Sequence, residues 1–262
     1  MNLSDVRIGF VGFGNMATAM AEGMVLSGDI KPEQIYACAG HFDKLAARAA
    51  EKGLNACENA AEVIDAADVV VIAVKPYMIN AVMGPVVDKL ADKIVVSVAA
   101  GWMNDKMEEL FAGIHHVSIM PNTPVAVCEG VILVEEDHTL SADEEELVSQ
   151  ILGTMGSVYS MPTKMFGPAG TVSGCSPAFI AMVIEALGDA AVKYGVPRKT
   201  AYQLVSQTLA GTAKLQLATG EHPGAMKDAV CSPGGTTIKG MSALEENGLR
   251  HALISAIDAI EG

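Results

Sequence analysis

The feature that most constrains the fold of this chain is the run VRIGFVGFGNMA at residues 6–17. Residues 6–11 are apolar and predict a strand, and a helical pattern follows over residues 15–26. Strand, glycine turn and helix in this order are the context that a GxGxxA dinucleotide-binding fingerprint requires. Gly12 permits the tight turn, and Gly14 lets backbone N–H groups approach a pyrophosphate. The pattern therefore predicts nucleotide binding, with a glycine turn that serves packing alone as the alternative.

The next part of the chain alternates between expected strands and helices. Continuous apolar runs such as DVVVIAV are typical of strands in a parallel sheet that is covered on both faces. The pattern favours an α/β fold, with an N-terminal Rossmann-type doubly wound sheet in residues 1–161. Ligands bind outside the carboxyl ends of such strands. The expected strands are residues 35–39, 54–56, 68–74, 93–99, 114–120, 127–134 and 158–161, and the expected helices are residues 43–52, 59–66, 77–90 and 141–155.

The end of the second expected strand indicates which nicotinamide cofactor is bound. An NAD site usually places an Asp or Glu there for the ribose diol, but the sequence is ACAGH at residues 37–41. His41, Lys44 and Arg48 follow closely and could meet a 2′-phosphate. The alternative for each is a solvated surface charge, which we favour for Arg48. We therefore expect NADPH, with NADH as the alternative, and assign His41 and Lys44 to the cofactor.

Residues 162–262 show no strand pattern and predict an all-α domain. One helix is expected over residues 176–194 and another over residues 197–219. The first of these is apolar nearly all round, so it must be buried. Because about 100 residues bury several such helices poorly alone, we expect a substrate-binding and dimerisation domain. The protein would be a homodimer, or a higher homo-oligomer built from dimers, and a compact monomeric helical lobe is the alternative.

The stretch VCSPGGTT at residues 230–237 is the candidate substrate site. The proline stops the preceding element, the two glycines leave the backbone bare, and a helix is expected from there to about residue 247. A glycine turn that feeds a helix presents free N–H groups and the positive end of the helix dipole to a carboxylate or phosphate. We expect the N–H groups of Gly235 and Thr236 to bind a carboxylate. The Thr237 hydroxyl would bind a second polar atom, with an N-cap role as the alternative.

Charge and cysteine content bear on partners and location. The net charge of −14 argues against nucleic acid and acidic membrane surfaces, because both need a basic patch. The acids at residues 135–137 and 143–146 are expected to form a solvated face rather than a metal site. Five cysteines without a CxxC pair suggest neither a disulfide framework nor a zinc site. No signal peptide is evident and no apolar run reaches the length of a membrane span, so we expect a cytoplasmic protein without metal.

Seven motifs, in chain order, resemble those of pyrroline-5-carboxylate reductase, the last enzyme of proline synthesis. The final motif is the specific one, whereas the first is shared with many dehydrogenases. The resemblance implies NAD(P)H-dependent reduction of 1-pyrroline-5-carboxylate to L-proline by a Rossmann domain and an all-helical domain that dimerises. The motifs are GFGNMA (12–17), AVKP (73–76), AAG (99–101), MPNTP (120–124), SGCSPAF (173–179), HPG (222–224) and KDAVCSPGGTT (227–237).

The resemblance also implies site residues and shows three departures from the family pattern. Ala229 stands where the family often has Asn, Ser118 stands where many members carry Arg, and residues 163–170 replace an acidic stretch and a threonine. Thr237 is the catalytic candidate. The implied cofactor positions are Gly12, Gly14, Asn15, Met16, Asn59, Val74, Lys75, Pro76, Ala99 and Ala100, and the implied substrate positions are Ser232, Gly235, Thr236 and Thr237.

The reaction agrees with the residues that the sequence offers. A protonated cyclic imine accepts hydride without a strong base, so placement and charge matter more than a His–Asp pair, which is not evident. A β-hydroxyacid dehydrogenase would need a lysine on the first long helix of the second domain, where only Lys193 occurs, near the helix end. The sequence is also compatible with a reductase that acts on a related imine, and with a nucleotide-sensing dimer that does not turn over substrate.

Overall fold

The computed structural model describes residues 2–262, and the chain forms two compact units, Met1–Gly174 and Cys175–Gly262. This division lies beyond the domain boundary expected after residue 161. The helix α7 (Thr163–Gly170) accounts for the difference, because it packs against the sheet of the first unit. Its Phe166 is buried there.

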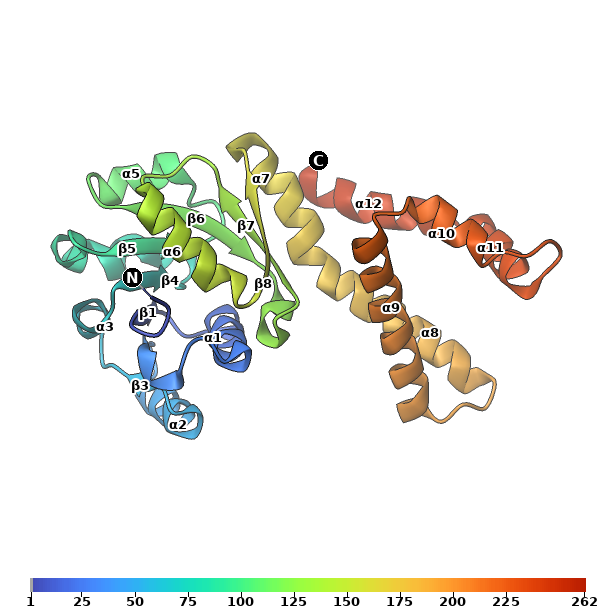
Figure 1. The fold of residues 1–262 in the computed structure, drawn as a ribbon, viewed down its shortest axis with the longest axis horizontal. Coiled ribbons are helices and arrows are strands. Elements are labelled where there is room, and N and C mark those ends of the chain that lie inside the picture. The colour runs from blue at the N-terminus through green and yellow to red at the C-terminus, as the bar shows by residue number, and fades with distance from the viewer. Residues whose placement is uncertain (1) are drawn as a thin grey trace. The chain divides into compact units, whose positions relative to one another are not determined.

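The first unit contains an eight-stranded sheet (Figure 1). Its strands are β1 (Ile8–Val11), β2 (Ile35–Cys38), β3 (Asn55–Ala56), β4 (Val69–Ile72), β5 (Ile94–Ser97), β6 (His116–Pro121), β7 (Gly130–Glu135) and β8 (Gly156–Met161). Their order is β3-β2-β1-β4-β5-β6-β7-β8, and β1 to β6 are all parallel. Ile8 lies opposite Ile35 on one side and Val69 on the other. The expected Rossmann-type sheet is confirmed, and β7 and β8 extend it in the opposite direction to β6.

Helices connect the strands of this sheet. They are α1 (Asn15–Ser27), α2 (Phe42–Lys52), α3 (Ala60–Ala66), α4 (Ile79–Met83), α5 (Asn104–Phe111) and α6 (Ala142–Gly153), with short 3₁₀ turns at Pro32–Gln34, Pro76–Met78, Gly84–Leu90 and Thr123–Val127. The single helix expected over residues 77–90 is wrong. The segment forms α4 and two 3₁₀ turns, and Pro85, next to Gly84, supplies no N–H to continue an α-helix.

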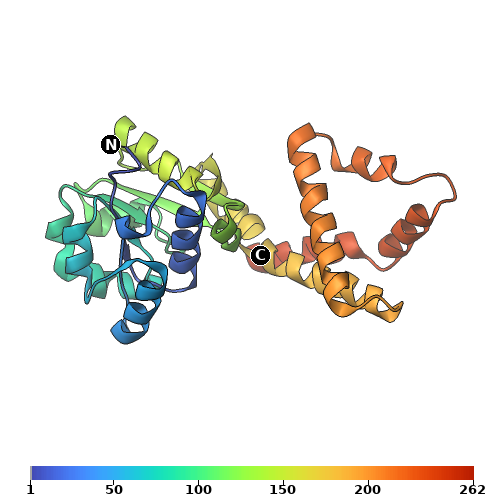
Figure 2. The ribbon, with the colours of Figure 1, turned by 60° about the horizontal axis from the view of Figure 1, so that its bottom comes forward.

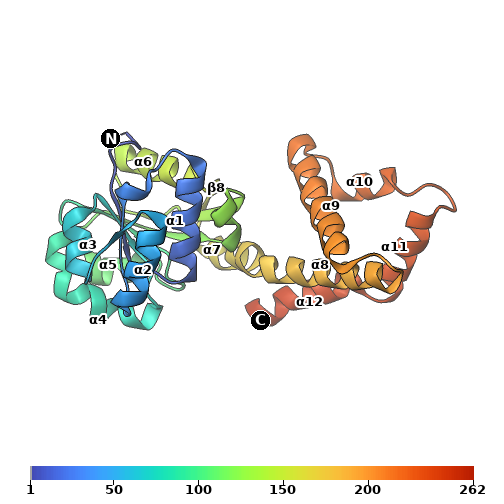
Figure 3. The same ribbon diagram turned by 90° about the horizontal axis from the view of Figure 1, so that it is seen from below.

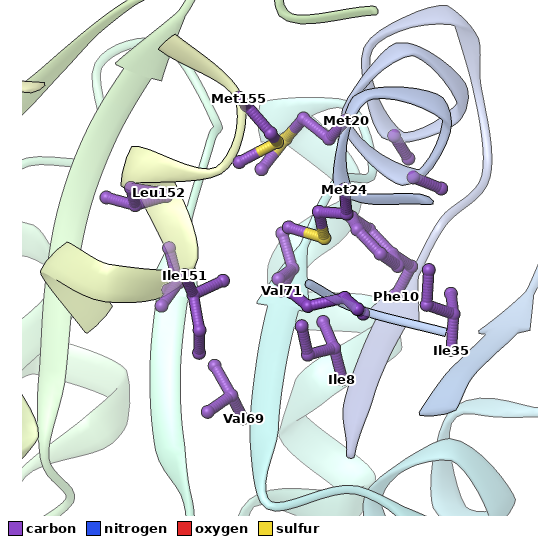
Figure 4. Packing of buried hydrophobic residues seen from close by; sticks show 14 of the residues in the cluster. Ile8, Phe10, Met20, Met24, Ile35, Val69, Val71, Ile151, Leu152 and Met155 are labelled. Carbon is purple, nitrogen blue, oxygen red and sulfur yellow. The ribbon is translucent and has the colours of Figure 1, made fainter. Parts of the chain in front are cut away.

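Two apolar clusters lie on opposite faces of the sheet. Phe10 belongs to one cluster and the adjacent Val11 to the other, because successive side chains of a strand point to opposite faces. Figure 4 shows the first cluster, in which Met24 of α1 lies beside Phe10, and Met20 of the same helix lies beside Met155, which follows α6. Burial on both sides explains the continuous apolar runs of the strands. It also fixes β1 and α1, which flank the glycine turn.

The second unit is all helical and buries very little of itself. Its helices are α8 (Ser176–Lys193), α9 (Arg198–Thr219), α10 (Pro223–Ala229), α11 (Thr236–Glu246) and α12 (Leu249–Glu261) (Figure 3). Helices α8 and α9 pack together where Gly188 faces the ring of Tyr202. Within residues 175–262, only Gly188 and Ala201 are fully buried, and large apolar side chains such as Met182 and Leu217 are 69% and 72% exposed. This open arrangement contradicts the compact monomeric lobe, because the unit has almost no core of its own.

The segment α7–α8 is continuous through a π-helical turn at Thr171–Cys175. Together they form a 31-residue helix, Thr163–Lys193, that is long and apolar enough to cross a membrane by length and composition. The expectation that no segment reaches this length is therefore wrong. Only 6% of its most apolar window is buried within the chain. Length and composition do not place a helix in a membrane, because a helix that pairs with a second protein chain passes the same test.

Candidate functional site

A cavity of about 830 Å³ opens in the first unit at the carboxyl ends of β1, β2, β4 and β5. The order of the sheet reverses between β1 and β4, which is the position at which doubly wound sheets bind ligands. The residues that line the cavity are Gly12, Phe13, Gly14, Asn15, Met16, Ala39, Gly40, His41, Lys44, Leu45, Arg48, Ala73, Val74, Lys75, Pro76, Met78, Val98, Ala99, Ala100 and Thr123.

The glycine turn at the floor of this cavity has the geometry of a phosphate-binding turn. Gly12 has a φ of +96°, and a Cβ there would lie 2.7 Å from the carbonyl carbon of Ala73. Its N–H donates to the carbonyl oxygen of Cys38, 3.0 Å away, and so ties the turn to β2. Gly14 is the N-cap of α1, and no heavy atom lies within 4 Å of where its Cβ would stand. No side chain caps α1 and its first turn holds no acid, so its N–H groups face open space.

The cavity brings together all but one of the predicted cofactor residues. Gly12 to Met16, Val74 to Pro76, Ala99 and Ala100 line it, as do His41 and Lys44. Asn59 does not line it. Its Oδ1 accepts from the N–H of Glu62 at 3.1 Å and its Nδ2 donates to the Glu62 carboxylate at 3.0 Å, so the side chain caps α3.

Arg48 belongs to this site, although the sequence favoured a solvated surface charge for it. It is exposed, as expected, but it lines the cavity, and its Nη1 donates to Oγ1 of Thr18 at 2.9 Å. The signal that could have found it is its position one helical turn after Lys44, on the same face of α2. Within the described chain, His41, Lys44 and Arg48 form no ion pair with a carboxylate, whereas Lys52 binds Glu22 at 2.7 Å.

The predicted substrate residues lie in the second unit, between α10 and α11. Figures 2 and 3 show this loop at the outer end of the helical unit, where it connects α10 to α11. The N–H of Gly235 donates to the carbonyl oxygen of Ser232 at 3.0 Å, and Gly234 has a φ of +68°. With Pro233 at the second position, this is a type II β-turn. A Cβ at Gly235 would lie 2.3 Å from Oγ of Ser232 and 3.1 Å from its carbonyl oxygen, so a larger residue there would require the Ser232 side chain to move.

The start of α11 is open to an anion. Gly235 is its N-cap and offers no side chain, and the first turn contains no acid. Because the Gly235 N–H closes the turn, the amides free for a ligand are those of Thr236, Thr237 and Ile238. The N-cap alternative for Thr237 is wrong, since Thr237 is the second residue of the helix. Its hydroxyl forms no hydrogen bond with the rest of the described chain, and both threonines are exposed.

The acidic run at the end of β7 is only partly solvated. Glu136 and Asp137 are exposed, but Glu135 is fully buried, which corrects the expectation of a wholly solvated face. Its carboxylate accepts from the N–H of Asn104 at 2.9 Å and contacts the hydroxyl of Thr163 at 2.7 Å. Burial raises the pKa of the Glu135 carboxyl, although both hydrogen bonds act against the rise. In residues 2–262 no group of three or more His, Cys, Asp and Glu side chains is placed to hold a metal ion.

Comparisons with known proteins agree over both units. Residues 163–261 match the family described as pyrroline-5-carboxylate reductase dimerisation, and residues 7–101 match the family described as NADP oxidoreductase, coenzyme F420-dependent. The pyrroline-5-carboxylate reductase of Treponema pallidum is 43% identical over 97% of this chain and 98% of its own. The chain belongs to the pyrroline-5-carboxylate reductase family. The Escherichia coli member of that family is 41% identical over 97% of this chain and 95% of its own.

Solved structures support the same family. The crystal structure of pyrroline carboxylate reductase from Plasmodium falciparum with NADP bound has a TM-score of 0.88 and 29% sequence identity. It covers 98% of this chain and 96% of its own. A pyrroline-5-carboxylate reductase from Coxiella burnetii has a TM-score of 0.84 and 31% identity, over 97% of this chain and 96% of its own.

Two departures from the pyrroline-5-carboxylate reductase pattern have structural consequences here. Ser118 is buried in β6, where its hydroxyl donates to the carbonyl oxygen of Trp102, so this position belongs to the core. In α7, Gly170 packs against Met120, and a Cβ at this position would lie 2.1 Å from the Met120 sulfur. Both substitutions therefore act in the packing of the first unit, on residues that lie outside the cavity lining.

Proposed function

We propose that this protein reduces 1-pyrroline-5-carboxylate to L-proline with NADPH, as the last step of proline biosynthesis. The observation that carries the proposal is the uncapped start of α11 after the turn at Ser232–Gly235, in a chain of this family. A small carboxylate fits such a helix start because free N–H groups and the helix dipole both favour an anion.

The cavity of the first unit fits a nicotinamide dinucleotide. Gly14 leaves open space at the start of α1, and the free N–H groups there suit the pyrophosphate. Val74, Lys75, Ala99 and Ala100 continue the lining along the strand ends. When bound, the reduced cofactor supplies the hydride. His41 and Lys44 at the α2 end of the cavity support a preference for NADPH over NADH, because no acid is present there to bind the ribose diol.

On the substrate side, the roles fall to backbone amides and one hydroxyl. The N–H groups of Thr236 and Thr237 would bind the carboxylate of the pyrroline ring, while Ser232 and Gly235 shape the turn beneath it. The Thr237 hydroxyl would hydrogen-bond the ring nitrogen, which must carry a proton for the C=N bond to accept hydride. The hydride adds to the ring carbon, and the electron pair of the C=N π bond moves to nitrogen to give the amine of proline.

The helical unit would complete its core in a homodimer. Its open helices and the match to the dimerisation family both support this arrangement. The exposed apolar side chains of α8 and α9 would then be covered by a second copy of the chain. The net charge of −14 supports an enzyme that acts on a small molecule rather than on nucleic acid or an acidic membrane surface, and the five cysteines without a CxxC pair support a cytoplasmic location.

The reaction is tested by mixing the purified protein with NADPH and 1-pyrroline-5-carboxylate. The expected result is loss of the NADPH absorbance with formation of an equal amount of proline. A protein that binds NADPH but forms no proline with either NADPH or NADH would instead be a nucleotide-sensing dimer. Oxidation of a β-hydroxyacid with NADP⁺, in the absence of imine reduction, would favour the dehydrogenase alternative.

A further inference from the structure

Helix α2 carries three basic side chains on the side that faces the cofactor cavity. His41 is the residue immediately before the helix, Lys44 lies in its first turn, and Arg48 lies one turn further along. All three line the cavity. Because residues four apart occupy the same face of a helix, Lys44 and Arg48 present their charges side by side.

A hydrogen bond to the neighbouring helix fixes the direction of Arg48. Its Nη1 donates to Oγ1 of Thr18 in α1 at 2.9 Å. One turn further along both helices, Lys52 binds the carboxylate of Glu22 at 2.7 Å. The contact to Thr18 uses one of the five N–H donors of the guanidinium, so the others remain for a ligand.

The charges around Arg48 favour an anionic ligand on its cavity side. No acid is among the residues that line the cofactor cavity, whereas Glu22 and Glu51 line a smaller groove between α1 and α2 together with Lys52 and Arg48. Lys52 already neutralises Glu22, and Thr18 binds Arg48 through a neutral hydroxyl. A guanidinium beside a lysine forms a good receptor for a phosphate, because both charges and several donors converge on its oxygens.

We propose that Arg48, oriented by Thr18, binds the 2′-phosphate of NADPH together with His41 and Lys44, and so sets the preference for NADPH over NADH. The proposal rests on the proposed function, since it concerns the cofactor of that reaction. Arg48 touches the phosphate directly. Thr18 is a positioning residue that acts through Arg48.

The test compares two adenosine ligands by calorimetry and two cofactors by kinetics. Adenosine 2′,5′-bisphosphate carries the 2′-phosphate and adenosine 5′-monophosphate does not. Arg48→Ala should weaken binding of the bisphosphate about 10- to 100-fold, because a charge-assisted hydrogen bond to the 2′-phosphate is lost. Binding of the monophosphate should stay within about 2-fold of the wild type. The KM for NADPH should rise to a similar extent while kcat and the kinetics with NADH hardly change.

Matched variants separate binding from helix packing. Lys52→Ala removes the parallel bridge between the same two helices and should leave the NADPH-to-NADH ratio unchanged. Thr18→Val should lower that ratio by a few-fold, and Thr18→Ser should restore it. Equal weakening of both adenosine ligands in Arg48→Ala, or no weakening of either, would overturn the proposal. Proline formation with NADH tests the reaction independently of Arg48, so a failure of the proposed function can be distinguished from a failure of the proposal for Arg48.

Discussion

Oγ1 of Thr163 lies 2.7 Å from Oε1 of Glu135 and also 2.7 Å from Oδ2 of Asp137. A hydroxyl has one proton to donate, so both contacts are hydrogen bonds only when one of the two carboxyl groups is protonated. Glu135 is buried and Asp137 is exposed, and burial raises the pKa of Glu135 above its ordinary value of 4.5. Burial therefore makes Glu135, at the junction of β7, α5 and α7, the carboxyl of the pair that is protonated more readily than an ordinary glutamate.

This arrangement predicts how stability changes with pH. Between pH 4.5 and the raised pKa, the folded protein holds a proton on Glu135 that the unfolded chain has lost. The contribution of Glu135 to the free energy of unfolding therefore falls as pH rises through that window. Glu135→Gln mimics the protonated side chain, so the variant should lose less stability than the wild type over the same window, by about 1.4 kcal/mol for each unit of pKa shift.

The measurement is urea unfolding of both proteins at several pH values from 4 upwards. Glu136→Gln serves as a control, because Glu136 is exposed and is not a partner of Thr163, so its replacement should leave the wild-type slope between pH 5 and 8 nearly unchanged. Identical pH profiles for the wild type and Glu135→Gln would show that Glu135 is ionised in the folded protein.

The two glycines of the N-terminal turn should respond differently to alanine. Gly14→Ala meets no heavy atom within 4 Å, and its φ of −84° suits any residue, so the variant should fold with nearly unchanged stability. Its methyl group would stand where the pyrophosphate approaches the amides, and NADPH affinity should fall at least 10-fold. Gly12→Ala would place Cβ 2.7 Å from the Ala73 backbone at a φ of +96°, so it should lose several kcal/mol of stability. Thermal unfolding and NADPH titration of both variants check this contrast, and equal stabilities would contradict it.

The sequence was sufficient to predict the Rossmann sheet and the nucleotide turn because both depend on local features. Apolar runs give the buried strands, and glycines at the end of β1 mark the close approach of backbone to ligand. Strand direction depends on long-range pairing, which no local pattern carries, so the reversal of β7 was not predicted. The break in residues 77–90 could have been predicted from Gly84-Pro85.

The parts of the candidate site that depend on neighbouring residues in the sequence could be predicted, whereas those that depend on contacts between distant segments could not. The Ser-Pro-Gly-Gly order of residues 232–235 is a type II turn signature, and the structure contains that turn. Glu135 was missed because acidic runs usually lie on the surface, whereas its burial depends on Asn104 and Thr163, which are distant in sequence. Arg48 was missed because its contact with Thr18 joins two helices.

The hydroxyl of Thr237 is predicted to contribute to catalysis. Thr237→Ala should lower kcat/KM for 1-pyrroline-5-carboxylate, because a polar contact to the ring nitrogen would be lost. The loss of transition-state stabilisation should be about 1–3 kcal/mol. Ser242→Ala is the control, because Ser242 lies on the same helix and its hydroxyl bonds the carbonyl of Ile238 at 3.0 Å. Initial rates at varied substrate concentration give kcat/KM for both variants. A kcat/KM for Thr237→Ala that equals that of the control would remove Thr237 from the mechanism.

The exposed apolar face of α8 is predicted to determine assembly. Met182 is 69% exposed in the single chain, and a charge placed there would have to be desolvated against the second copy. Met182→Glu should weaken the dimer by about 2 kcal/mol or more, roughly 30-fold in dissociation constant. Sedimentation at several concentrations measures this change, and the melting temperature of the variant should depend more strongly on concentration. Leu26→Glu is the matched control on the first unit, where Leu26 is 62% exposed at the end of α1. If Leu26→Glu dissociated the protein and Met182→Glu did not, the interface would lie on the first unit instead.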